Sequence, residues 1–308
     1  MRNFIITVDT EGDNLWRWKD GELITTHNSQ FIPRFQELCE SYGFKPVYLT
    51  NYEMALDDAW VSYIKSKAQQ GLCEIGMHIH AWNSPPEYKL INNNGGNPYI
   101  TEYPDNLIYE KMKFLTKCLK ERFEVPIKVA RSGRWATNEI YFDTLYNLGY
   151  IGDCSFTPEL DLSKIPGYSY NMGNDYRKAN KNTHLHPSGI VEVPMTTRLI
   201  HHISFGSLRH KASTLIKGDS MWLRPHRKSL DELLLLSNKV KEEGGEYLEF
   251  MLHSSELMPG GSPYFESENE VEILYNIIQK YFSWIGKEKY RGITLSRYID
   301  DWKMKNIT

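Results

Sequence analysis

Acidic residues and histidines stand at the ends of three strand-like runs of this sequence. The runs cover residues 3–8, 73–77 and 247–252. The polar residues that follow them are Asp9, Glu11 and Asp13 after the first run, His78 and His80 after the second, and His253 after the third. An α/β barrel gathers its reactive groups at the C-terminal ends of its strands, so these side chains are expected to meet at one mouth. The sequence therefore predicts a catalytic site built from carboxylates and imidazoles.

The spacing of these residues favours a metal site. Residues two apart in an extended segment point to the same side, so His78 and His80 can present both imidazoles to one point. Asp9 and Glu11 can present their carboxylates in the same way. Two imidazoles and one carboxylate make a three-ligand set with an open position, which is typical of a catalytic zinc site. The HLH run at 184–186 lies in a polar stretch before a proline, and we expect no site there.

The elements that must position these residues alternate along the chain. Strands are expected at residues 3–8, 46–50, 73–77, 127–130, 150–153, 191–194, 247–252 and 292–294. Helices are expected at residues 30–42, 55–70, 106–123, 137–148, 229–243 and 266–284. Glycines at 43, 71 and 149 directly follow three of these helices, where a left-handed C-terminal cap is wanted. The repeated strand–helix order, with seven or eight strands, predicts an α/β barrel with a parallel sheet.

The chain is expected to form one domain over residues 1–308. Two stretches, 84–104 and 157–189, break the strand–helix rhythm, and long irregular loops of this kind form lids or binding walls. The net charge is −3 and no lysine-arginine run occurs, so the surface that a nucleic-acid binder needs is absent. The sequence has no apolar segment of ~18 residues and no charged leader, so we expect no membrane span and a cytoplasmic location. The oligomeric state stays open.

Six segments of the sequence resemble the polysaccharide deacetylase superfamily, the NodB-type proteins of carbohydrate esterase family 4. They are VDTEGD at 8–13, EIGMHIHAWNSPP at 74–86, ARSGRW at 130–135, GDCSFTPELD at 152–161, WLRP at 222–225 and HSSELMPGGSPYF at 253–265. They follow the family's order and are most similar to its WalW-like branch, which is associated with lipopolysaccharide and surface-polysaccharide biosynthesis. The resemblance implies a distorted (β/α) barrel of about seven strands and metal-dependent hydrolysis of an amide.

The first motif of this resemblance implies a general base and a metal ligand. Asp9 matches the family's base. The commonest family pattern has its carboxylate ligand at the next position, where this chain has Thr10. Branches with the acid one residue further exist, so Glu11 is the implied ligand and Asp13 its substitute.

The second motif implies the remaining ligands, with a departure from the usual spacing. The family usually places its histidines four residues apart, whereas this chain has His78 and His80, with Trp82 at the usual second place. The implied cofactor is a divalent metal, with Zn²⁺ as the first candidate and Co²⁺, Ni²⁺ or Mn²⁺ as alternatives.

The later motifs imply three further catalytic residues. Arg131 matches the arginine that pairs with the base and orients it. His253 matches the histidine that protonates the leaving amine, and Asp153 matches an acid that tunes this histidine.

The resemblance thus implies a hydrolase that removes an N-acetyl or related acyl group from a sugar in surface-polysaccharide or lipopolysaccharide biosynthesis. Its partner would be an acylated sugar or glycan, and a nucleotide-linked or lipid-linked sugar would suit a cytoplasmic enzyme. Two alternatives stay open. One is a degenerate, metal-free carbohydrate-binding or scaffold protein of the same fold, which the altered histidine spacing favours. The other is a metal phosphoesterase of the PHP type, which also uses an HxH pair on a seven-stranded barrel.

Overall fold

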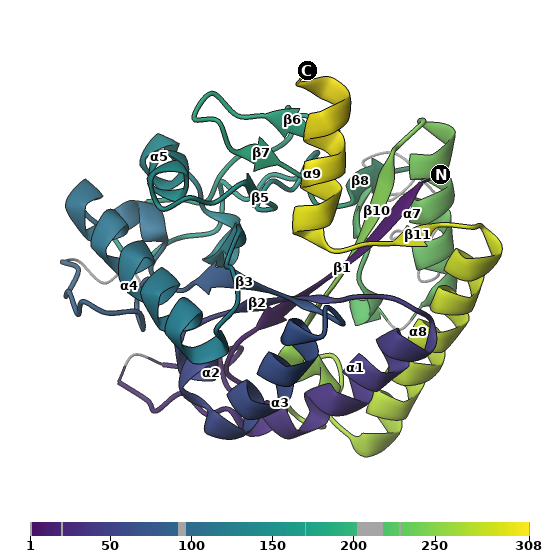
Figure 1. The fold of residues 1–308 in the computed structure, drawn as a ribbon, viewed down its shortest axis with the longest axis horizontal. Coiled ribbons are helices and arrows are strands. Elements are labelled where there is room, and N and C mark those ends of the chain that lie inside the picture. The colour runs from purple at the N-terminus through teal and green to yellow at the C-terminus, as the bar shows by residue number, and fades with distance from the viewer. Residues whose placement is uncertain are drawn as a thin grey trace.

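A curled sheet of mostly parallel strands with helices on its outer side makes up the protein (Figure 1). The computed structural model describes residues 2–19, 21–91, 97–169, 171–201, 218–227 and 229–307. Within these ranges the main sheet has nine strands. Eight of them pair in the order β10-β1-β2-β3-β4-β5-β7-β6, and the ninth, β11, pairs with β1. The pairs are parallel except that of β6 with β7. The expected distorted (β/α) barrel is confirmed.

All the strands expected from the sequence have counterparts in this sheet. The strands are β1 (Asn3–Thr10), β2 (Val47–Thr50), β3 (Glu74–Ile79), β4 (Val129–Ser132), β5 (Gly152–Asp153), β6 (His184–Leu185), β7 (Val191–Glu192), β10 (Tyr247–His253) and β11 (Arg291–Gly292). The strand β6 was not expected. A separate antiparallel pair, β8 (Thr197–Ile200) with β9 (Asp219–Trp222), was not expected either.

The helices follow the expected positions with two differences. They are α1 (Ile32–Ser41), α2 (Tyr52–Leu56), α3 (Asp58–Gln69), α4 (Asp105–Phe123), α5 (Glu139–Asn147), α7 (Leu230–Glu242), α8 (Glu268–Lys287) and α9 (Leu295–Asn306). The helix expected at 55–70 is in fact two helices, because Asp57 adopts an extended conformation and its side chain caps α3 by accepting from the Trp60 N–H. The helix α9 was not expected. Short 3-10 turns are η1 (His27–Phe31), η2 (Ile100–Glu102), η3 (Gly133–Trp135), η4 (Pro225–Arg227) and η5 (Ser254–Leu257).

Glycines end three of the helices as the sequence indicates. Gly43, Gly71 and Gly149 have φ values of +70°, +69° and +84°, a left-handed conformation that glycine adopts without steric cost. These turns lead the chain back toward the sheet after α1, α3 and α5.

Successive side chains along a strand point to opposite faces of the sheet, and they form two separate apolar cores, one inside the barrel and one between the sheet and the helices. In β1, Phe4 and Ile6 pack with the helices, whereas Ile5 belongs to a second cluster inside the barrel. This inner cluster contains the first parts of several strands together with Leu295 and Ile299 of α9, so α9 closes the barrel at the end where its strands begin. The opposite end of the barrel, where the strands finish, carries the polar side chains.

The register of the parallel pairs brings distant residues to the same level. Asp9 of β1 stands opposite His253 of β10, and His78 of β3 stands opposite Arg131 of β4. In β1, Thr7 and Asp9 follow Ile5 at intervals of two and therefore point into the barrel. None of the helices in the described ranges has the length and apolar character that a bilayer crossing requires.

Candidate active site

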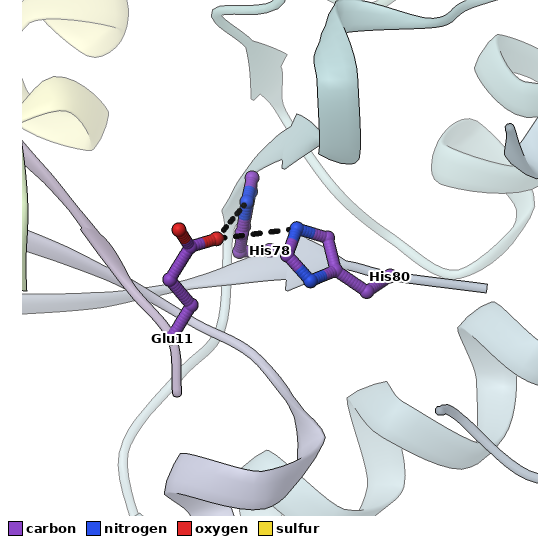
Figure 2. Close-up of side chains that lie close together, drawn as sticks. All are labelled: Glu11, His78 and His80. Carbon is purple, nitrogen blue, oxygen red and sulfur yellow. Dashed lines mark ion pairs between the residues drawn. The ribbon is translucent and has the colours of Figure 1, made fainter. Parts of the chain in front are cut away.

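Glu11, His78 and His80 meet at the C-terminal ends of β1 and β3 (Figure 2). The Oε2 atom of Glu11 lies 3.4 Å from Nε2 of His78 and 3.2 Å from Nε2 of His80. All three side chains are buried. Within the described parts of the chain, they are the one group of three or more such residues close enough to share a metal ion.

The geometry of these three residues fits a divalent ion. Ligand atoms that bind one ion at ~2.0–2.2 Å in a tetrahedral arrangement lie ~3.3–3.6 Å apart, which is close to the distances from Glu11 to the two imidazoles. Burial and the neighbouring imidazoles hold the pKa of His80 well below its usual value, so His80 is neutral, the form that binds a metal. Burial also acts on His78, but the carboxylates of Asp9 and Glu11 outweigh it and raise the pKa of His78.

Hydrogen bonds hold Glu11 in its place and give Asp13 a different role. The Glu11 N–H donates to Ser254 Oγ at 3.1 Å, and the Asn28 side chain donates to the Glu11 carbonyl at 2.8 Å. Asp13 instead accepts from the Thr25 hydroxyl at 2.5 Å and from the Asn28 N–H at 3.2 Å. Both carboxylate oxygens of Asp13 are thus engaged in holding the loop after β1, and Glu11 is the carboxylate at the cluster.

Asp9 lies beside the three-residue cluster in a fully buried network. Its Oδ1 atom accepts a charged hydrogen bond from Arg131 at 2.6 Å, and its Oδ2 atom lies 3.9 Å from Nε2 of His78. Burial raises the pKa of Asp9, but Arg131 and then the imidazoles of His78 and His253 outweigh it, so the pKa lies below its ordinary value. Asp9 is therefore ionised at neutral pH.

Arg131 also binds a second carboxylate, Glu249 of β10, which the sequence reasoning missed. The guanidinium donates to Glu249 Oε1 and, at 3.0 Å, to the Thr7 hydroxyl. Glu249 stands four residues before His253, so the period of two in a strand turns both into the barrel. A charged residue inside the apolar run YLEFML was the signal that could have identified it.

His253 approaches the cluster from β10. Its Nε2 atom lies 3.8 Å from Asp9 Oδ2 and 3.8 Å from Glu11 Oε1. The ring of Trp16 packs edge-on against it at a centroid distance of 4.9 Å. The imidazole thus faces the same space as the base and the carboxylate ligand.

Arg224 and Glu256 contact the other side of His253, and the sequence reasoning missed both roles. Arg224 donates to Nδ1 of His253 at 3.1 Å and to Glu256 at 2.8 Å. Glu256 accepts from the His253 backbone N–H at 2.8 Å. Burial raises the pKa of Glu256, but Arg224 and His253 outweigh it and hold the pKa at about 2. Both residues lie within motifs at 222–225 and 253–265 that the sequence singles out.

Asp153 lies apart from this group. Its carboxylate accepts from the Tyr141 hydroxyl of α5 at 2.7 Å and from the Ser155 N–H at 2.9 Å, so it points toward the helix layer. Its neighbours in sequence face the barrel interior, since Cys154 belongs to the inner core. The structure therefore brings together Asp9, Glu11, His78, His80, Arg131 and His253, and it does not bring Asp153 to them. The influence of Asp153 on His253 stays a prediction.

An aromatic groove of about 640 Å³ begins beside the cluster. Trp82 forms part of its wall, and the same indole stacks on the His80 ring at a centroid distance of 4.3 Å. The other aromatic residues lining the groove are Trp18, Tyr52, Tyr88, Tyr103 and Tyr168. Two of the expected loops, 84–104 and 157–189, both contribute to this wall.

Comparisons with known proteins identify solved structures of similar fold. No protein-family model matches the sequence, and no curated protein matches it. Among solved structures, the chain is similar to a protein assigned as a polysaccharide deacetylase from Mycobacterium smegmatis, with a TM-score of 0.58 at 12% identity over 100% of this chain and 92% of that chain.

Two further solved structures share the architecture as well. The chain is similar to a GH57 branching enzyme from Thermococcus kodakaraensis, with a TM-score of 0.54 at 11% identity over 98% of this chain and 71% of that one. It is also similar to a 4-alpha-glucanotransferase from Thermococcus litoralis, with a TM-score of 0.51 at 11% identity over 98% of this chain and 38% of that one. At such identities the likeness describes the fold. The chain therefore has a distorted (β/α) barrel fold, which it shares with the structure assigned as a polysaccharide deacetylase.

Proposed function

We propose that this protein is a metal-dependent hydrolase that removes an N-acetyl or related acyl group from a sugar. The observation that carries the proposal is the convergence of three metal-binding side chains, Glu11, His78 and His80, with Asp9 and His253 beside them. A divalent ion held there would supply Lewis acidity toward the acyl carbonyl and would lower the pKa of the water that it binds.

Asp9 is the general base of the proposed reaction. Arg131 binds its Oδ1 atom, which leaves Oδ2 facing the mouth of the barrel. Since the pKa of Asp9 is lowered, its carboxylate is ionised at neutral pH and can accept the proton of a water molecule that attacks the acyl carbon. Arg131 holds this carboxylate in one orientation during the transfer.

His253 is the general acid of the proposed reaction. An amine leaves an acyl carbon readily only if it is protonated as the C–N bond breaks. The Nε2 atom of His253 faces Asp9 and Glu11, and Arg224 and Glu256 fix the ring from its Nδ1 side. To act as the acid, the ring must carry protons on both nitrogens. Its Nδ1–H would then face Glu256 Oε2, 3.6 Å away, in place of the hydrogen bond from Arg224, and its Nε2–H would be donated to an amine leaving from the space between Asp9 and Glu11.

The aromatic groove supports a sugar as the substrate. Aromatic rings present flat apolar faces, and Tyr and Trp add a polar edge that can bind hydroxyl groups. Trp82 lines the groove and also stacks on His80, so a glycan bound in the groove would lie near the cluster. The pathway, surface-polysaccharide or lipopolysaccharide biosynthesis, and the cytoplasmic location are parts of the same proposal.

The first experiment tests the metal. The purified protein is expected to take up about one equivalent of Zn²⁺, and His78→Ala or His80→Ala should reduce the uptake, because two ligands do not complete a tetrahedral site. The chain contains a matched control in its other HxH run, where His184→Ala should leave uptake unchanged. Co²⁺, Ni²⁺ and Mn²⁺ are titrated in parallel.

The second experiment tests the reaction. Release of acetate from N-acetylated oligosaccharides is measured with the metal-loaded protein and after chelation. A protein that binds no divalent ion but still binds glycans would support the alternative of a metal-free carbohydrate-binding protein. Hydrolysis of phosphate esters instead of amides would support the phosphoesterase alternative.

A further inference from the structure

The two histidines of the cluster are oriented by different means. A metal-binding histidine usually donates its second ring N–H to a carboxylate, a carbonyl or a water molecule, which fixes the ring. His78 follows this rule, because its Nδ1 atom lies 3.1 Å from the Arg131 carbonyl. The Nδ1 atom of His80 is buried and has no hydrogen-bond partner within the described residues. Something else must hold the His80 ring.

Packing takes the place of the hydrogen bond at His80. The indole of Trp82 stacks on the imidazole with a centroid distance of 4.3 Å and an angle of 18° between the planes. Gly133, at the end of β4, comes so close that a Cβ atom at this position would lie 2.4 Å from Cδ2 of His80 and 2.6 Å from the Ile79 carbonyl. Glycine is thus required here for space, and it lets the backbone press against the edge of the ring.

The turn that carries Trp82 is itself anchored. The Ser84 N–H donates to the His80 carbonyl at 3.2 Å and closes the turn. The buried Lys111 of α4 donates to the carbonyls of Ser84 and Pro86, each at 2.6 Å. The Asn83 side chain donates to Glu53, which also accepts from the Gly12 N–H in the loop after β1. The indole therefore rests on a fixed support.

We propose that Trp82 and Gly133 are positioning residues for the metal ligand His80, which they orient by stacking and by close approach. The inference rests on the metal site of the proposed function, but it does not depend on which reaction the site performs. Removal of an outer-shell partner of a ligand typically lowers metal affinity ~10–100-fold, and we expect an effect of this size at Trp82.

The test measures metal binding in three variants. Trp82→Ala removes the stacked ring, Trp82→Phe keeps a flat ring, and Gly133→Ala adds a methyl group where there is no room. Zn²⁺ affinity is measured by competition with a chromophoric chelator, and the visible spectrum of the Co²⁺-loaded protein reports the coordination geometry. Tyr88→Ala is the matched control, because Tyr88 is an aromatic residue of the same groove whose ring packs with Tyr103.

The expected result is a ~10–100-fold loss of Zn²⁺ affinity and a changed Co²⁺ spectrum in Trp82→Ala and in Gly133→Ala. Trp82→Phe should recover most of the affinity, and Tyr88→Ala should change it less than ~3-fold, since it removes no ring that stacks on the ligand or on Trp82. Thermal melts of the metal-free variants check that each is folded. If Trp82→Ala does not fold, Trp82→Phe still provides the test. Wild-type affinity and spectrum in Trp82→Ala would overturn the positioning role and leave the proposed function intact. A wild-type protein that binds no metal would overturn both.

Discussion

Arg131 is shared between two buried carboxylates, and this sharing governs the state of the base. Burial raises the pKa of Glu249 to about 7, although Arg131 and Thr7 act in the opposite direction. The pKa of Asp9, bound to the same guanidinium, is lowered. Near neutral pH, Glu249 can therefore take up a proton while Asp9 remains ionised. The positive charge of Arg131 then compensates the negative charge of Asp9 alone.

The Asp9→Asn variant tests the base directly. It should keep its fold and its metal but lose activity by ~10²-fold or more, the scale that a positioned general base contributes. Turnover and metal content are measured on the same samples, with a thermal melt because the variant leaves Arg131 with less compensating charge. Unchanged turnover would place the proton transfer on another residue.

The His253→Ala variant separates an acid from a ligand. Turnover of amide substrates should fall far more than that of activated aryl esters, because the leaving group of the ester needs no proton. Metal content should stay the same, as His253 lies outside the three-residue cluster. A variant that loses its metal would make His253 a ligand, and an equal loss on both substrates would exclude it as the acid.

Glu256 should make a measurable contribution to acid stability. Its pKa in the folded protein is about 2, below the value of ~4.3 expected in an unfolded chain, so the stabilisation is present above that value and is lost as the pH falls toward 2. A shift of this size corresponds to on the order of 3 kcal/mol. Unfolding by urea, measured between pH 2 and 6, should show a shallower pH dependence for Glu256→Gln than for the wild type. Parallel curves would disprove the lowered pKa.

At the scale of elements, the strands could be predicted from the sequence more accurately than the segments that connect them. Mainly apolar runs such as FIITV and YLEFML are typical of strands that are buried on both faces. The bounds predicted for β1 and β10 are therefore correct to within a few residues. The break between α2 and α3 depends on the side-chain conformation of Asp57, which periodicity does not reveal. The helix α9 has charged residues along much of its length and buries Leu295, Tyr298 and Ile299 against strands far away in sequence.

At the site, too, some positions could be predicted from the sequence and others could not. The two-residue spacing of His78 and His80 in an extended segment was enough to predict that they converge. The partners of His253 were not predictable in this way, because Arg224 reaches it from a segment outside β10. Asp153 was predicted to lie at the site and does not. Its position in the strand turns its side chain toward α5 instead of into the barrel.

The anchoring of the 84–86 turn by Lys111 gives an element-scale prediction. Lys111→Met should destabilise the protein by ~2 kcal/mol, because it leaves the carbonyl group of the buried Ser84, and that of Pro86, without their donor. The free energy of unfolding is measured by denaturant titration, with Lys113→Met on the exposed side of the same helix as the control. A loss no greater than that of the control would show that water replaces the ammonium group.

At the scale of the whole molecule, the metal site joins strands that belong to one sheet. A ligand that binds only the folded state stabilises it by RT ln(1 + [L]/Kd), or ~2.7 kcal/mol at a hundredfold excess over Kd. For a chain of this size we expect that this excess of Zn²⁺ raises the unfolding temperature by ~4 °C. Calorimetry should show one transition that moves down on chelation, and His80→Ala should abolish the shift. Two transitions, with only one of them sensitive to the metal, would contradict a single domain over residues 1–308.

The pairing of β1 with β10 also sets an order of events during synthesis. Glu11, His78 and His80 leave the ribosome early, whereas His253, which stands beside Asp9 in the finished sheet, comes much later. At ~5–20 residues per second, the ribosome needs ~10–35 s to add the residues between His80 and His253. During that time β1 can pair with β2, but its other edge is an apolar strand without a partner. The nascent protein thus contains its three candidate metal ligands before His253 is synthesised, and until β10 pairs with β1 this strand edge is open to pairing with other chains.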